Sequence, residues 1–216
     1  MTLRQFKCLA AFTLALMTVP TLFAQKWELG AGGAGTFYTS KSVSAGSLKA
    51  NAGFKSGWGL TGWIGNDISN LIGGEIRYMY QANDLKLESG GTTYTFGAKS
   101  HSIHYDFLLH AAPRNAKVRP FVAFGAGMRG YTGTGREVAL QPLSNFAFLT
   151  KTSEWVPLVS LGAGVKFIPS KRLAFRAEFR DYLSPIPSQV ITPAPGAKLS
   201  GWYQNFVALF GVSLLF

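Results

Sequence analysis

The sequence has little cysteine, little charge and, outside its first 24 residues, no long hydrophobic run. Its single cysteine, Cys8, lies near the N-terminus, so the rest of the chain has no disulfide framework and no thiol chemistry. Charged residues make up 14% of the chain, against about 25% in ordinary globular proteins. No stretch after Ala24 reaches the about 18 apolar residues that a membrane-spanning helix needs. If the chain inserts into a membrane, it must therefore do so with β-strands.

The N-terminal segment has the layout of a secretory signal peptide. A basic start at Arg4 precedes an apolar stretch over residues 9–19, which is short and interrupted by Thr, unlike a membrane anchor. A small residue, Ala24, ends the segment. We therefore predict a cleaved signal peptide over residues 1–24 and a single domain over residues 25–216.

Apolar residues recur with a period of two through this domain. A period of two is typical of a β-strand, whose successive side chains point to opposite faces. In the last segment one face is entirely apolar: Phe206, Ala208, Phe210, Val212, Leu214 and Phe216. Seven earlier segments show the same period: 26–38, 52–64, 71–82, 98–110, 119–131, 159–167 and 173–182. Eight strands of about ten residues, each with one apolar face, predict an all-β fold, a transmembrane up-and-down antiparallel β-barrel.

The connections between these strands alternate in length. Outer-membrane barrels have short turns on the periplasmic side and long loops outside. Here the long connections cover residues 39–51, 83–94, 132–153 and 184–200, and the short ones 65–70, 111–118 and 168–172. This alternation is what eight strands require when both ends of the domain lie in the periplasm. A ten-stranded barrel is the alternative, if the third or fourth long connection contains a hairpin.

A bilayer explains the apolar last strand. Backbone N–H and C=O groups in a membrane must be paired internally, so this strand is expected to close against the first. Its apolar face then meets lipid, and no polar tail is needed after Phe216. Aromatic side chains gather at membrane interfaces, and the candidates for such a girdle are Trp27, Trp58, Tyr78, Tyr80, Trp155 and Trp202.

Three stretches carry a resemblance to a known family: "RPFVAFGAGMRGY" (119–131), "LAFRAEFRDY" (173–182) and the terminal "VALFGVSLLF". With the signal peptide, they make the chain similar to the small eight-stranded outer-membrane β-barrel proteins, such as outer membrane protein X and the membrane domain of outer membrane protein A. The resemblance implies a place in the outer membrane of a Gram-negative cell. Independently of it, we expect no cofactor, for the reason given below for the glycine motifs. It also assigns the signal read by the barrel-assembly machinery to Phe210, Val212, Leu214 and Phe216.

Charged residues on several strands fall on the face opposite the apolar one and should point into the barrel. They are Glu75, Arg77, Asp106, Arg129, Lys166, Arg176, Glu178 and Arg180, with Tyr182 in the same row. An eight-stranded barrel is just wide enough for side chains to fill it, and buried ions need partners. We predict an ionic network that plugs the lumen, with Arg129–Glu178 and Arg176–Glu75 as candidate pairs. The alternative is a narrow gated channel, whose gate would be Arg129 together with the row Arg176, Glu178, Arg180 and Tyr182.

Motifs for cofactor or metal binding are weak. Two stretches match G-x-G-x-x-G, Gly30–Gly35 and Gly125–Gly130, but both lie inside predicted strands. A dinucleotide site needs the motif between a strand and a helix, so these glycines are expected to make room in a narrow lumen. His104 and His110 share a face about 20 Å apart, too far for one metal ion. We expect no metal.

One group of residues leaves lipid A modification as a third class of function. Ser100, Ser102 and His104 follow one another on one face, with Glu154 far away in the sequence. A catalytic serine needs its base within hydrogen-bond reach, whereas Ser102 and His104 are about 6.6 Å apart along the strand and point into the lumen. We therefore expect no enzyme activity.

The long connections carry scattered basic residues: Lys41, Lys49, Lys86, Arg136, Lys151 and Lys198. Such residues suit loops that meet the phosphates of lipopolysaccharide, and they lack the regular aromatic spacing of a nucleic-acid groove. The stretch "LSNFAFL" within 132–153 predicts an exposed apolar contact surface. The expected function is structural or interactive, in a monomer whose loops face an extracellular ligand.

Overall fold

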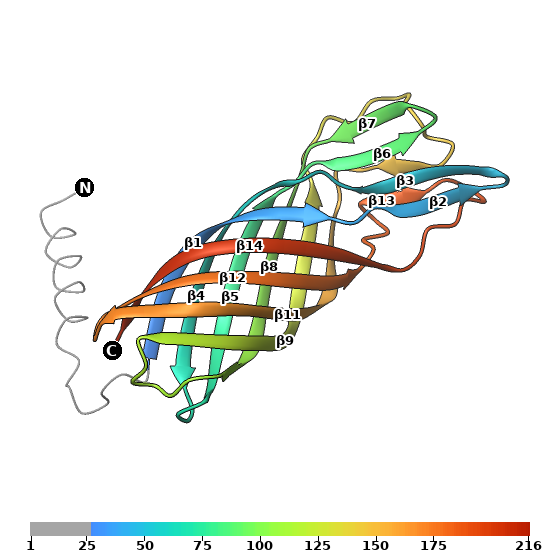
Figure 1. Ribbon diagram of the computed structural model, residues 1–216. Coiled ribbons are helices and arrows are strands. Elements are labelled where there is room, and N and C mark those ends of the chain that lie inside the picture. The colour runs from blue at the N-terminus through green and yellow to red at the C-terminus, as the bar shows by residue number, and fades with distance from the viewer. Residues whose placement is uncertain (1–26) are drawn as a thin grey trace, which may run out of the picture.

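The computed structural model describes residues 27–216, so the predicted signal peptide lies outside the described residues. Within them, eight antiparallel strands close into a barrel in the order β1-β14-β12-β11-β9-β8-β5-β4 (Figure 1). Their bounds are β1 Trp27–Tyr38, β4 Gly57–Asp67, β5 Ile72–Ala82, β8 Ala98–His110, β9 Val118–Gly133, β11 Ser153–Ser170, β12 Leu173–Pro185 and β14 Trp202–Leu215. None of the described residues belongs to a helix that is long and apolar enough to cross a membrane. The predicted fold, an eight-stranded antiparallel barrel, is confirmed.

The last strand closes against the first, as predicted. β1 and β14 pair without interruption from Glu28↔Leu215 to Tyr38↔Asn205, and the N–H of Phe216 donates to the carbonyl of Trp27 at 3.0 Å. Because closure removes the free edges, the barrel strands pair their backbone groups without water. All further strands of the described chain lie outside the barrel, so the ten-stranded alternative is wrong.

Successive side chains along each barrel strand alternate between the outer and the inner face of the barrel wall. Apolar side chains such as Leu60, Phe107 and Phe179 point outward and stay exposed. The six residues proposed for the aromatic girdle also lie on the outer face, with Tyr80 half-buried. The alternate residues from Phe210 to Phe216 point outward too. These positions suit contact with lipid, while the roles as girdle and assembly signal remain predictions.

The long connections fold into a head at the barrel end away from the C-terminus (Figure 1). The first two form a four-stranded sheet in the order β2-β3-β6-β7, with bounds β2 Lys41–Ala45, β3 Leu48–Phe54, β6 Leu85–Ser89 and β7 Thr92–Phe96. The last two form a two-stranded sheet, β10 Ala147–Leu149 with β13 Ile191–Pro193. The long connections predicted at 39–51 and 83–94 thus contain strands of their own, which pair with one another.

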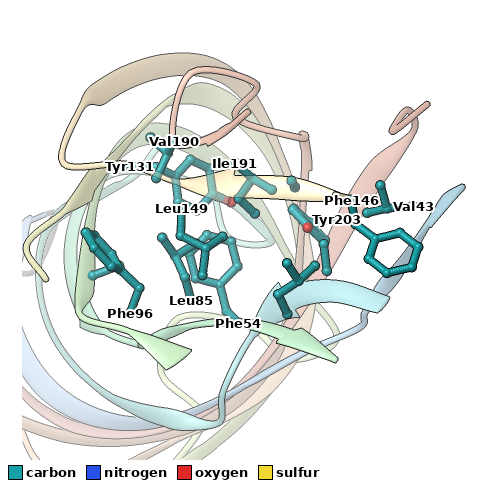
Figure 2. Packing of buried hydrophobic residues seen from close by; sticks show 14 of the residues in the cluster. Val43, Phe54, Leu85, Phe96, Tyr131, Phe146, Leu149, Val190, Ile191 and Tyr203 are labelled. Carbon is teal, nitrogen blue, oxygen red and sulfur yellow. The ribbon is translucent and has the colours of Figure 1, made fainter. Parts of the chain in front are cut away.

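A hydrophobic core holds the head together (Figure 2). Phe54, Leu85 and Phe96 of the four-stranded sheet pack with residues of the other connections, and Phe54 stacks on Tyr131 of β9 with ring centroids 5.1 Å apart. The strand predicted over residues 52–64 places Phe54 on its apolar face with Trp58 and Leu60, and therefore toward lipid. That placement is wrong because Phe54 ends β3, and the membrane strand begins only at Gly57.

The apolar stretch 143–149 belongs mostly to this core. Phe146, Ala147 and Leu149 are buried, and among the apolar side chains of the stretch only Phe148 is exposed. The prediction of an exposed contact surface here is wrong, because pairing of β10 with β13 turns these side chains toward the barrel mouth rather than toward solvent. The segment 143–149 is therefore part of the core of the head rather than a recognition loop.

Deletion of residues 135–150 is expected to leave the barrel folded and to disrupt the packing of the head. The eight barrel strands keep all their pairings, whereas the head loses Phe146 and Leu149 from its core. Limited proteolysis in lipid vesicles should then cut the remaining head connections while a resistant barrel persists. Deletion of Gly90 and Gly91, at a hairpin tip with open space around it, is the control and should leave the head resistant. A deletion variant without heat-modifiable migration on a gel would contradict the expectation.

Candidate functional site

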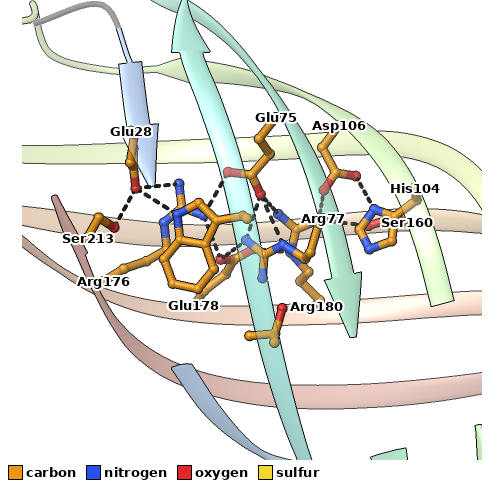
Figure 3. Close-up of polar contacts among 12 residues, drawn as sticks. Glu28, Glu75, Arg77, His104, Asp106, Ser160, Arg176, Glu178, Arg180 and Ser213 are labelled. Carbon is orange, nitrogen blue, oxygen red and sulfur yellow. Dashed lines mark hydrogen bonds and ion pairs between the residues drawn. The ribbon is translucent and has the colours of Figure 1, made fainter. Parts of the chain in front are cut away.

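A cluster of ion pairs fills the middle of the lumen (Figure 3). Its centre is Glu75 of β5, whose carboxylate accepts hydrogen bonds from Arg77 at 2.6 Å, Arg176 at 2.8 Å and Arg180 at 3.1 Å. The arginines reach it from two walls, since Arg77 follows on β5 and the other two lie on β12. The predicted pair Arg176–Glu75 is therefore present.

Two further carboxylates complete this central cluster. Glu178 of β12 pairs with Arg77 at 2.9 Å and with its neighbour Arg180. Asp106 of β8 pairs with Arg180 at 2.5 Å and lies 3.1 Å from the ring of His104. Each arginine thus bridges carboxylates from different strands, which ties β5, β8 and β12 together across the lumen.

Glu28 of β1 adds a second group that the sequence reasoning missed. Its carboxylate lies 2.5 Å from Lys166 of β11 and 3.5 Å from Arg176, and it accepts hydrogen bonds from Trp63 Nε1 at 2.9 Å and Ser213 at 2.7 Å. The period of two could have identified Glu28 as an inward residue, because it alternates with the outward residues of the first strand. Applying the same alternation from the first residue of that strand would have added Glu28 to the predicted lumen charges.

Trp63 of β4 is an aromatic residue inside the lumen. Only 2% of it is exposed, and Arg176 and Arg77 lie over its ring at 4.7 and 5.1 Å. Gly30 and Gly211 make room for this ring, because a Cβ on either would lie 2.3 or 2.5 Å from an indole carbon. The predicted use of glycine to make space in a narrow lumen applies at these positions.

Arg129 of β9 forms a separate layer nearer the head. It donates to Asn205 at 2.9 Å and to Gln81, and its guanidinium lies over the rings of Tyr131 and Tyr182 at 5.2 and 5.6 Å. The proposed pair Arg129–Glu178 is wrong, because the register places Arg129 opposite Val156 and Ser102, nearer the head. Amide oxygens and aromatic faces, rather than a carboxylate, hold this cation.

Paired charge therefore occupies the middle of the lumen. The cations Arg77, Arg129, Lys166, Arg176 and Arg180 and the carboxylates Glu28, Glu75, Asp106 and Glu178 are all buried. A buried charge is stable only when hydrogen-bonded or paired, and here the partners come from strands on opposite walls. Among these nine groups one cation is in excess, Arg129, in the layer nearer the head.

The residues considered for lipid A chemistry are not brought together. His104 contacts Asp106 through one ring nitrogen, and the other lies 3.2 Å from the hydroxyl of Tyr182. Glu154 lies at the head end of β11, where it accepts from the backbone N–H of Gln189. Ser102 is buried in the lumen wall. His104 therefore belongs to the ionic network rather than to a nucleophile.

The chain has relatives among known outer-membrane proteins. Residues 8–211 match the family model of the outer membrane protein beta-barrel domain. No curated protein sequence matches the chain. Similar solved structures include Neisserial surface protein A (TM-score 0.55, 12% identity, covering 88% of this chain and 97% of that one) and OprG from Pseudomonas aeruginosa (TM-score 0.57, 13% identity, covering 89% and 96%). Outer membrane protein AlkL in lipid bilayers is similar as well (TM-score 0.53, 12% identity, covering 89% and 90%). At these identities the likeness concerns the fold.

Proposed function

We propose that this chain, which belongs to the outer membrane β-barrel protein family, works as a closed barrel that carries a folded head on the cell surface for a structural or binding role. The observation that carries the proposal is the network of ion pairs across the middle of the lumen. Glu75 and Glu178 are 2% and 5% exposed and each contacts three arginines. Because the ion pairs cross the barrel from wall to wall, they would obstruct passage through the lumen. We therefore place the function at the surfaces of the two ends of the barrel.

The head supports this proposal through its own core and its charge. Outer-membrane barrels place their long connections outside the cell, so the head would face the exterior. Lys49, Arg136, Lys151 and Lys198 are exposed on it. We propose lipopolysaccharide phosphates as their first partner, because basic side chains are attracted to anionic membrane surfaces. Delivery by a signal peptide, folding by the barrel-assembly machinery and a monomeric state complete the proposal.

A narrow channel is the second candidate, and one observation favours it. Several guanidinium nitrogens of the lumen, in Arg77, Arg129 and Arg176, are buried and have no hydrogen-bond partner among the described residues. Buried N–H groups of this kind are usually satisfied by ordered water. A file of such waters through the network would give a path for small ions.

Single-channel recording in a planar bilayer separates the two candidates. We expect no steady conductance from refolded protein, because the ion pairs of the central cluster span the lumen. Insertion is verified by the different migration of unboiled and boiled samples. Glu178→Gln is the matched variant, since it removes one lumen charge and keeps the side-chain volume. A reproducible conductance whose ion selectivity shifts in Glu178→Gln would replace the closed barrel with the channel.

A further inference from the structure

The lumen contains a cavity at the end opposite the head. Its volume is about 320 Å³, and its lining comes from the ends of β1, β4, β5, β8, β9 and β11 with the turn at residues 114–117. Both ends of the described chain lie here, since Trp27 and Phe216 are hydrogen-bonded to each other. In outer-membrane barrels the end with short turns faces the periplasm, so this cavity would open toward that compartment.

His110 is a buried polar residue of this cavity. It is the last residue of β8, only 2% of it is exposed, and it lines the cavity. Neither of its ring nitrogens has a hydrogen-bond partner within residues 27–216. A buried polar group without a partner costs free energy, and such a group in a native structure is normally satisfied by ordered water, an ion or a ligand that binds there.

The charge around His110 is cationic in balance. The cavity lining includes the basic residues Arg114, Lys117, Arg119, Lys166 and Lys171 and the carboxylates Glu28, Asp67 and Glu75. The carboxylates are already engaged. Asp67 pairs with Arg119 at 3.0 Å and Arg114 at 3.4 Å, and Glu28 pairs with Lys166.

Two basic residues of the lining offer donors for a ligand. Arg119 is 3% exposed, and its Nε has no hydrogen-bond partner within the described chain. Lys117 lies on the rim with an exposed side chain. Guanidinium and ammonium groups beside an imidazole match the oxygens of a phosphate or carboxylate group. A pocket for a cation or for a neutral apolar ligand would not be lined by an excess of positively charged N–H donors.

We propose that this cavity binds a small oxyanion, a phosphate or carboxylate group, and that His110, Arg119 and Lys117 contact its oxygens. The volume lies near the lower end of the range of about 300–1,000 Å³ for small-molecule sites, so a single anionic group with a short substituent would fill it. Two sources offer this chemistry: a soluble anion of the periplasm, or the headgroup of a phospholipid in the adjoining leaflet. The site does not depend on the proposed role of the head.

Nuclear magnetic resonance of the histidine rings tests the proposal directly. The protein is refolded in octyl glucoside micelles, which contain no phosphate, and inorganic phosphate is added at constant ionic strength and pH. We expect a saturable shift of the His110 ring signals. His104, in the central cluster, and His101, on the outer face, are internal references that should not move. A second sample in phosphatidylglycerol nanodiscs without phosphate distinguishes the sources, because a bound headgroup would shift His110 before any addition.

Matched lysine variants define the site. Lys117→Gln is expected to weaken phosphate binding by about tenfold, the effect of losing one charge-assisted contact. Lys198→Gln removes an equally exposed lysine from the head and should leave binding unchanged. The proposal is overturned if His110 shows neither a saturable shift with phosphate in micelles nor a shifted signal in phosphatidylglycerol nanodiscs, if His104 shifts in parallel, or if both lysine variants bind alike.

Discussion

Glu75→Gln is expected to lower the free energy of unfolding by about 3–5 kcal/mol, the cost of removing one partner from a buried ion pair. The carboxylate of Glu75 contacts Arg77, Arg176 and Arg180. Glutamine keeps the size of the side chain but cannot neutralise them, so the central cluster would retain three guanidinium groups and only two carboxylates, Glu178 and Asp106. Urea unfolding of the protein in lipid vesicles, followed by tryptophan fluorescence, measures the loss.

Glu88→Gln is the matched control for this prediction. Glu88 pairs with Lys86 in the head at 2.8 Å, and both side chains are partly exposed. Exposed ion pairs contribute about 0–1 kcal/mol, so this variant should unfold at nearly the same urea concentration as the parent. If the two substitutions had equal effects, the lumen network would not be the element that ties the barrel walls together.

Gly30→Ala is expected to be similarly harmful although it adds a single methyl group. The new Cβ would lie 2.3 Å from the indole of Trp63, which is closer than any real contact allows. Trp63 has no space to retreat, because Gly211 lies against its other edge and Arg176 covers its face. Overpacking of this kind costs about 1–3 kcal/mol and sometimes more. The refolding yield and the urea midpoint both report it.

Gly33→Ala provides the control on the same strand. Its Cβ would meet nothing within 4 Å, because this residue faces outward, so the substitution should change stability by less than about 0.5 kcal/mol. A double-mutant cycle with Trp63→Leu identifies the cause. In that background Gly30→Ala should cost clearly less, because the clashing ring is gone, and equal costs in both backgrounds would refute the steric account.

These predictions bear on function because they separate the parts of the molecule. Substitutions in the lumen should act on stability, whereas changes in the head and in the cavity beside His110 should act on binding. A variant such as Lys117→Gln lies outside the central cluster, so its effect on an anion can be measured in a barrel of unchanged stability.

Much of the barrel could be predicted from local pattern. The period of two determines which side chains face lipid and which face the lumen, because successive residues of a strand must point to opposite sides. Alternation of long and short connections predicts an up-and-down order of strands. For this reason the inward positions of Glu75, Arg176 and Glu178 and the closure of β14 on β1 were predicted correctly.

The partners of the lumen charges were decided by tertiary structure. A strand's own sequence says nothing about its register against a strand a hundred residues away, and that register places Arg129 beside Gln81 and Asn205 instead of Glu178. Pairing among the connections likewise turned expected loops into a head with a core around Phe54 and Phe146.

The sequence by itself thus determined the class of fold, the two faces of each barrel strand and the residues available to fill the lumen. Only the tertiary structure decided which of those residues meet, that Trp63 needs Gly30 and Gly211, and that His110 lines a cationic cavity without a partner within the described chain. The physical reason is that the direction of a side chain is a property of its own strand, whereas contacts across a lumen depend on how all eight strands are staggered when the barrel closes.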